Sequence, residues 1–147
     1  MQSIQIVPLN SLTNIDIIDL FSAFRHLPGA ALLDSANSSH PDSRFDIFVA
    51  EPVVSIQEIN GKPQVFSAVT SLPQSEETNV IKQIIDLQSH IFSDTECPTT
   101  ELPFVVGSMG YFGYDWGRSL ENIGARNPND YQTPHLQVGI YTWSVIR

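Results

Sequence analysis

The stretch GSMGYFGYDWG, Gly107 to Gly117, places four glycines among five aromatic or long apolar side chains. A phosphate-binding loop would need a lysine and a hydroxyl after its last glycine, because these groups reach the phosphate oxygens. Here Tyr114 and Asp115 follow Gly113, and so many aromatic rings favour extended chain. Glycines on both faces of a strand are typical of a backbone that another backbone or a bound molecule approaches closely. The motif therefore predicts a β-strand.

The composition of the 147-residue chain is that of one acidic globular domain. Hydrophobic residues make up 41% of it, and the net charge is −9 with only seven lysines and arginines. Nucleic acid and anionic membrane surfaces are disfavoured as partners, because both require clustered cations. No apolar run approaches the roughly 20 residues that cross a bilayer, and the N-terminus lacks a signal-peptide pattern, so a cytoplasmic location is expected. The single cysteine, Cys97, excludes an internal disulfide.

Hydrophobic periodicity predicts two amphipathic helices. The first is capped at Thr13 or Asn14 and stops at Pro28-Gly29. Its apolar stripe is Ile17, Leu20, Phe21, Phe24 and Leu27. The stripe of the second helix is Ile81, Ile84, Ile85, Gln88 and Ile91 or Phe92. A third, short helix is expected in YDWGRSLE, directly after the glycine-rich strand.

Apolar or alternating runs between turn signals predict the strands. The strongest hairpin signal is Asn60-Gly61, because these residues tolerate the positive φ angles of a type I′ turn. The expected strands are residues 4–9, 30–35, 45–59 with a bend at Pro52, 64–69, 104–114 and 135–147. Strands outnumber helices, so we expect an α+β fold with a mainly antiparallel sheet. This sheet would be part of a β-sandwich flanked by two or three helices.

The sequence offers no pattern for catalysis or metal binding. Its sixteen acidic residues are scattered, and no GxSxG elbow presents a nucleophile. The four histidines lie far apart without metal-ligand spacing; they are His26, His40, His90 and His135. We therefore assign no catalytic and no metal-binding residue to this chain.

One polar constellation stands out at the end of the predicted strand ALLDS. Asp34-Ser35 end this strand, and Arg44-Phe45-Asp46 begin the next one after a loop. A guanidinium, a hydroxyl and a ring are the groups that hold a small amino acid or carboxylate, since the guanidinium fork pairs with carboxylate and the ring covers apolar surface. The plainer alternative is that Arg44 pairs with Asp34 or Asp46 while Phe45 packs in the core. Both interpretations are open at this point.

Three segments carry, in order, a resemblance to a known family: LLDSANSSHPDSRFDIFVAEP, LPFVVGSMGYFGYDWGRSLE and VGIYTW. They resemble the N-terminal region of aminodeoxychorismate synthase component I, the large subunit of para-aminobenzoate synthase and a relative of anthranilate synthase component I. The likeness runs from about Leu27 to Trp143. It implies that the glycine-rich segment is sheet leading into a short helix and that it binds no phosphate. The segment SRFDIFVAEP favours the aminodeoxychorismate branch.

The resemblance implies that residues 1–147 form the N-terminal part of an enzyme about three times as long. Such enzymes aminate chorismate toward para-aminobenzoate for folate biosynthesis, using Mg²⁺ and ammonia from a glutamine amidotransferase subunit. Their chorismate and metal residues lie in the C-terminal half, so this chain alone is expected to be inactive and to hold no cofactor. The strand end at Arg147 is expected to be a cut, and residues 135–147 are expected to form an edge through which the fragment self-associates.

The resemblance also implies a tryptophan pocket, which is regulatory in anthranilate synthases. Leu33, Asp34 and Ser35 match its L-L-x-S segment, while Arg44 and Phe45 match the S-R-F-D segment beside it. We call these five residues the strand-end site.

Asp42 stands where a close relative has tyrosine, which predicts weaker tryptophan binding. Two further interpretations are open besides the aminodeoxychorismate branch. One is the regulatory region of an anthranilate synthase component I, and the other is a free-standing module that binds a small amino acid or a protein.

Overall fold

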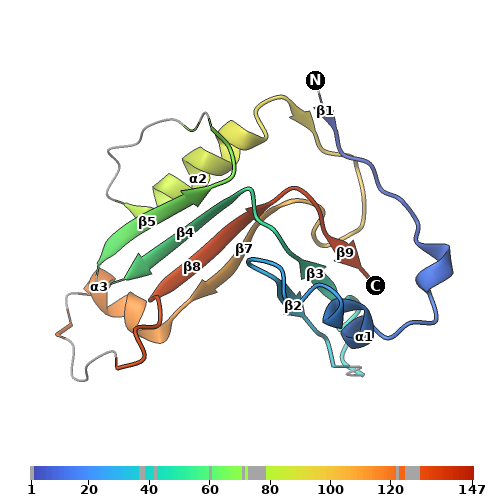
Figure 1. Cartoon of the computed structure of the whole chain (residues 1–147), viewed down its shortest axis with the longest axis horizontal. Helices are drawn as coiled ribbons and strands as arrows, with labels where there is room; N and C mark the ends of the chain where they lie inside the picture. Colours follow the sequence, from blue (N-terminus) through green and yellow to red (C-terminus); the bar gives the residue numbers. More distant parts are fainter. Residues whose placement is uncertain are drawn as a thin grey trace. The chain divides into compact units, whose positions relative to one another are not determined.

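The structure, a computed structural model, describes residues 2–36, 39–41, 43–59, 61–70, 72, 79–121, 123–124 and 130–147. The chain divides into two compact units, each assembled from segments far apart in sequence. Unit 1 comprises Met1–Pro52, Ile91–Gly107 and Tyr141–Arg147, and unit 2 comprises Val53–His90 and Ser108–Ile140. Antiparallel sheets with flanking helices confirm the α+β class, although there are two such sheets where the sequence suggested one (Figure 1).

Unit 1 holds a three-stranded antiparallel sheet with a cluster of aromatic rings against it. In sheet order its strands are β2 (Ala31–Leu33), β3 (Ile47–Val49) and β9 (Val145–Ile146). The fully buried ring of Phe48 lies 5.6 Å from the ring of Phe21 in helix α1 (Ile17–Ser22) and 5.2 Å from that of Phe24. Trp143 adds a fourth ring 6.2 Å from Phe48. Burial of large aromatic surfaces makes this cluster the core of unit 1.

Helix α1 is capped by Asp16, whereas the sequence predicted Thr13 or Asn14. The Asp16 carboxylate accepts a hydrogen bond from the backbone N–H of Ile18 at 2.9 Å, and its charge is favourable at a helix N-terminus. Several consecutive residues could cap here, and packing decides among them because the buried face begins directly after Asp16. The helix ends at Ser22, earlier than the predicted stop, and turns carry the chain onward.

The first strand also differs from the prediction. β1 (Gln2–Ser3) pairs in parallel with β6 (Thr95–Glu96), whereas residues 4–9, the predicted strand, belong to no sheet. A 3₁₀ helix, Asn10–Leu12, follows them. An apolar run predicts extended chain, but it does not provide a neighbouring strand to pair with.

Unit 2 holds a four-stranded sheet and helix α2 (Val80–Ile91). In sheet order its strands are β5 (Lys62–Ser67), β4 (Val54–Ile59), β8 (Leu136–Tyr141) and β7 (Gly107–Phe112). Ile56 and Ile140 lie on one face of the sheet and are completely buried. Helix α2 lies beside this sheet in Figure 1, and the Ser108 hydroxyl of β7 donates to Gln88 of α2 at 2.6 Å.

The predicted hairpin is confirmed. Ile59 of β4 pairs with Lys62 of β5, which leaves two residues for the turn. Gly61 has φ of +72°, a conformation that glycine adopts without a Cβ clash, while Asn60 lies outside the described residues. Pro63 lies in β5, an edge strand, and edges are where sheets tolerate a proline.

Residues 135–147, predicted as one strand, form two strands in different sheets. β8 lies between β4 and β7, whereas β9 is the outer strand of the other sheet. At the break, the hydroxyl of Ser144 donates to the carbonyl of Val105 at 2.8 Å, an example of a side chain that competes with ladder pairing. The alternation of apolar residues continues through the break, so the sequence pattern did not indicate where β8 ends and β9 begins. The predicted edge is therefore reduced to Val145–Ile146.

The glycine-rich segment is a strand followed by helices, as predicted. After β7 come a 3₁₀ helix (Tyr114–Trp116) and helix α3 (Gly117–Glu121). Gly107 has φ of +132°, a conformation that side chains rarely adopt. A Cβ on Gly110 would overlap the Gln137 carbonyl oxygen and lie 2.6 Å from the Val138 Cα. The close backbone approach that the motif predicted is thus made by the neighbouring strand β8.

The buried face of α2 is rotated from its prediction. Ile84 is buried as expected, but Ile81 and Ile85 are 36% and 57% exposed. The buried residues are Val80, Gln83, Ile84 and Leu87. A polar residue at a buried position, Gln83, explains why the apolar pattern indicated another face. No helix within the described ranges is long and apolar enough to cross a membrane.

Candidate functional site

The strand-end site lies where β2 ends and β3 begins. These two strands pair antiparallel, so the residues that follow one and precede the other leave the sheet at the same end. Leu33 is 53% exposed, Asp34 and Arg44 are exposed, and Ser35 and Phe45 are half-buried. The structure therefore places all five predicted residues at one end of this strand pair.

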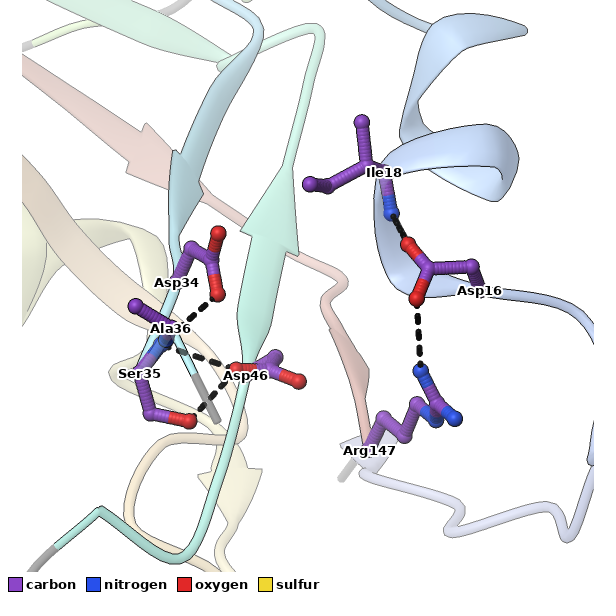
Figure 2. Close-up of polar contacts among 7 residues, drawn as sticks. All are labelled: Asp16, Ile18, Asp34, Ser35, Ala36, Asp46 and Arg147. Atoms are coloured by element: carbon purple, nitrogen blue, oxygen red, sulfur yellow. Dashed lines mark hydrogen bonds and ion pairs between the residues drawn. The ribbon is translucent and has the colours of Figure 1, made fainter. Parts of the chain in front are cut away.

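Asp46 joins the two strands at this end, as Figure 2 shows. Its Oδ1 accepts a hydrogen bond from the backbone N–H of Ser35 at 2.8 Å and another from the Ser35 hydroxyl at 2.7 Å. The neighbouring Asp34 accepts from the backbone N–H of Ala36 at 2.7 Å, which closes a tight turn in which Ala36 has φ of +55°. Two aspartates thus hold the chain as it leaves β2.

The backbone of Asp46 is fixed on its other side by Arg147. The N–H of each residue donates to the carbonyl of the other, both at 2.9 Å. The Arg147 guanidinium lies 3.6 Å from the carboxylate of Asp16, the cap of α1 (Figure 2). Asp46 therefore connects β2, through its side chain, with β9, through its backbone.

The surroundings of Asp46 favour its ionised form. Hydrogen bonds from the backbone N–H and then the hydroxyl of Ser35 hold the pKa of the Asp46 carboxyl below its ordinary value of 3.8. Burial acts in the opposite direction, and the positive charge of Arg147 adds to the lowering. Near neutral pH this carboxylate is therefore a pure hydrogen-bond acceptor.

Arg44 stacks on its neighbour. Its guanidinium carbon lies 5.1 Å from the centroid of the Phe45 ring, within cation–π range. Within the described residues no ion pair joins Arg44 to Asp34 or Asp46, and Phe45 is half-buried. The plainer alternative, an Arg44 ion pair with Phe45 packed in the core, therefore does not describe this segment. That these residues share a ligand pocket stays a prediction, and Asp42 lies outside the described residues.

Sequence reasoning missed the role of Asp46, which it considered only as a partner for Arg44. A usable signal was present, since an acidic residue directly precedes the apolar strand Ile47–Val49 and faces a strand that ends in Asp-Ser. The contacts of Arg147 and Asp16 had no such signal, because they depend on how α1 packs.

Other polar groups of the described chain suggest structural roles. Glu58, on the buried side of β4, accepts a hydrogen bond from the indole N–H of Trp116 at 3.1 Å and so fastens the helices that follow β7. Cys97 is exposed. Among the described residues no group of three or more His, Cys, Asp or Glu could hold a metal ion.

The fold and the site define an α+β protein with two antiparallel sheets and an acidic turn at a strand end. No protein-family model matches the chain. The chain is similar to aminodeoxychorismate synthase component 1 of Escherichia coli strain K12, with 38% identity over 128 residues, 86% of this chain and 27% of that protein. The proteins of the same name from Salmonella typhimurium strain LT2 and Klebsiella aerogenes are each 32% identical to this chain. Each of these matches also covers 86% of this chain and 27% of the relative.

Among solved structures, anthranilate synthase component I from Streptococcus pneumoniae TIGR4 matches with a TM-score of 0.49 and 23% identity. That match covers 90% of this chain and 26% of the solved chain. The curated relatives confirm the resemblance to aminodeoxychorismate synthase component I that three sequence motifs predicted. The chain spans about 27% of the length of these relatives.

Proposed function

We propose that this chain is the N-terminal portion of an aminodeoxychorismate synthase component I, which aminates chorismate toward para-aminobenzoate. The observation that carries the proposal is 38% identity with the Escherichia coli protein of that name over 128 residues. The match takes in nearly the whole of this chain but only 27% of the relative, which leaves room for the chorismate-binding part elsewhere in the enzyme.

On this proposal the rest of the enzyme binds chorismate and Mg²⁺, and a glutamine amidotransferase subunit delivers ammonia. Chemistry on chorismate requires groups that position the reactants and stabilise the charge that develops in the transition state. The sequence of this chain offers no such set of groups. The 147-residue chain alone should therefore form no aminodeoxychorismate from chorismate, ammonia and Mg²⁺.

Within the enzyme, the strand-end site would line a pocket for tryptophan or a similar small amino acid. Arg44 is exposed and free of ion pairs within the described residues, so its guanidinium can hold a carboxylate. Leu33, which is 53% exposed, offers apolar surface at the same end of the β2–β3 strand pair. These features support a pocket that binds rather than reacts.

A segment exchange in the Escherichia coli relative tests the enzyme assignment. The matched segment of that protein is replaced by the corresponding residues of this chain, in a strain that lacks component 1. We expect growth without para-aminobenzoate, because the exchanged segment supplies the same fold to the rest of the enzyme.

The control is the same exchange carrying Phe48→Ala, which removes a fully buried ring and should abolish growth. A chimera that accumulates as soluble protein to the level of the unaltered relative, yet does not support growth, would contradict the assignment.

A further inference from the structure

Strand β7 is an outer strand of the four-stranded sheet of unit 2, and only one of its edges is paired. The sheet order is β5, β4, β8 and β7, so β8 lies on one side of β7, and within the part of the chain that the structure describes no strand lies on the other (Figure 1). An unpaired edge presents a row of backbone N–H and C=O groups. Either water or another strand must satisfy these groups.

The direction of the β7 amides follows from one hydrogen bond. The N–H of Gly113, the residue after β7, donates to the carbonyl of His135, the residue before β8, at 2.7 Å. N–H groups alternate in direction along a strand, so that of Tyr111 also points toward β8, whereas those of Gly110 and Phe112 point away from it. Gly110 and Phe112 are both exposed. Their N–H groups are therefore accessible to a further strand.

The two outer strands of this sheet differ in how they are protected. β5 begins with Lys62 and Pro63, and lysine and proline on an edge discourage further pairing. β7 has the sequence GSMGYF, which contains neither a charged residue nor a proline. Both strands are six residues long, so length does not explain the difference. The sequence thus protects the edge of β5 and leaves the edge of β7 able to pair.

The side chains of β7 describe the strand that would fit beside it. Tyr111 and Phe112 are 42% and 49% exposed, which is much apolar surface for one end of a short strand. Gly110 has no side chain, because β8 approaches it closely. A large side chain on a neighbouring strand can pack over an edge glycine and recover the contact that the glycine cannot make. A strand with a bulky residue opposite Gly110 and apolar residues beside the two rings would fit this edge.

Two occupants compete for such an edge: a second copy of this chain and a strand elsewhere in the same enzyme. The chain spans about 27% of the length of its curated relatives, so on the proposed function most of the enzyme lies outside it. A strand of the same polypeptide is present at an effective concentration of the order of millimolar, which a second molecule reaches only in concentrated solution. The remainder of the enzyme is therefore the favoured occupant.

We propose that the free edge of β7 is an interaction surface that pairs, backbone to backbone, with a strand from the remainder of an aminodeoxychorismate synthase component I. The sheet of unit 2 then continues past β7 into the rest of the enzyme. The proposal rests on the proposed function, because the remainder of the enzyme has to exist for β7 to bind it. It gives the glycine-rich motif a role on its outer edge, besides the close approach of β8 on its inner edge.

Amide hydrogen exchange resolved to single residues tests whether this edge is free and what covers it. In the 147-residue chain the amides of Gly110 and Phe112 should exchange at least about tenfold faster than that of Gly113, which is held by His135. In the chimera with the Escherichia coli relative, Gly110 and Phe112 should become protected about as well as Gly113. Rapid exchange of both amides in a chimera that supports growth would overturn the pairing of β7 and leave the proposed function intact.

The isolated chain gives a second decision that does not depend on the chimera. Protection of Gly110 and Phe112 that persists on dilution would mean that the edge is already covered within the chain, and protection that is lost on dilution would identify a second copy as the occupant. Either result overturns the proposal. If the chimera does not support growth, the named occupant is lost with the proposed function, while exchange in the chain still decides whether the edge is free.

Proline variants separate the two edges of β7, because proline has no N–H to donate. Phe112→Pro removes an N–H that points away from β8, and Tyr111→Pro removes one that points toward it. Phe112→Ala is the matched control for loss of the ring, which lies 5.1 Å from the ring of Trp116. In the 147-residue chain Phe112→Pro should unfold at nearly the same temperature as Phe112→Ala, and Tyr111→Pro at a lower one.

In the chimera, Phe112→Pro should abolish the growth without para-aminobenzoate that Phe112→Ala still permits, because only the proline blocks pairing with the further strand. Equal growth of the two Phe112 variants would overturn the proposal. So would a loss of stability in the 147-residue chain that is as large for Phe112→Pro as for Tyr111→Pro, because the N–H of Phe112 would then belong to the pairing with β8.

Discussion

Asp46 illustrates how one carboxylate can contribute to stability in a way that depends on pH. It accepts two hydrogen bonds from Ser35 in the folded chain, and these bonds lower its pKa relative to the unfolded chain, where 3.8 is the ordinary value. A group whose folded-state pKa is lowered stabilises the fold fully above its unfolded pKa. That contribution is lost as the pH falls through the folded-state pKa.

We therefore predict that Asp46→Asn flattens the acid limb of the stability profile. Below about pH 4 the free energy of unfolding of the unaltered chain should fall with decreasing pH more steeply than that of the variant. Urea unfolding at a series of pH values between neutral and strongly acidic measures both slopes. Parallel acid limbs would show that the Ser35 hydrogen bonds do not favour the ionised form of Asp46.

Gly110 allows a second prediction, because its lack of a side chain is required by a neighbour. Gly110→Ala should destabilise the chain by roughly 1–3 kcal/mol, since the new Cβ would overlap the backbone at Gln137 and Val138. Gly117→Ala is the matched control: no atom lies within 4 Å of its Cβ position, and its φ of −58° suits alanine. That variant should be neutral or up to about 1 kcal/mol more stable. Thermal unfolding of both variants decides, and equal effects would exclude the close-approach explanation.

Helix α2 shows, at the level of an element, that packing decides which of the predicted apolar side chains are buried. Two adjacent isoleucines were both expected to face the core, but Ile84 is 8% exposed and Ile85 is 57% exposed. Ile84→Ala should cost about 2–5 kcal/mol through lost burial and the cavity that remains. Ile85→Ala should change stability by about 0.5 kcal/mol at most. Urea unfolding compares the two variants, and comparable losses would mean that the exposed face of α2 is covered in solution.

The elements that the sequence predicted correctly are those with a local cause. Asn60-Gly61 determines a hairpin by its own backbone preferences, and the glycines after Pro103 indicate a closely approached strand. The elements that it missed are decided by distant partners. The cap of α1, the face of α2 and the break before β9 depend on which surface lies opposite, and periodicity carries no information about that.

The same division holds at the strand-end site. Antiparallel strands on either side of a loop must bring Ser35 and Arg44 to one end, so the grouping was predictable from the strands alone. The hydrogen-bond pattern was not, because Asp34 and Asp46 are equivalent by composition and only the geometry assigns Ser35 to one of them.

On the scale of the whole molecule, self-association depends on which strands have an unpaired edge, because such an edge can pair with another copy of the chain. The predicted edge, residues 135–147, is reduced to β9, because β8 has a neighbour on each side. We predict that the chain dimerises at high concentration through β9 and that Val145→Lys prevents this, since charged residues on an edge discourage further pairing.

Sedimentation velocity over a range of concentrations measures this association. Thr142→Lys is the control, because it adds the same charge at an exposed position in the break between β8 and β9. Identical sedimentation of the unaltered chain and Val145→Lys would remove β9 as the contact.

The interleaving of the two units has a consequence for the inheritance of this gene. Unit 1 contains both the first and the last segment of the chain. A single recombination event anywhere between these two segments therefore gives a unit 1 that combines residues from two parents. Unit 2 stays of one parentage only when the exchange falls outside residues 53–140. Recombinants with exchange points inside that interval combine β4 from one parent with β8 from the other, although these strands pair along most of their length. In gene libraries shuffled among diverged relatives, the folded variants should therefore have exchange points near the ends of the coding region for residues 1–147. Variants with exchange points between β4 and β8 should be lost.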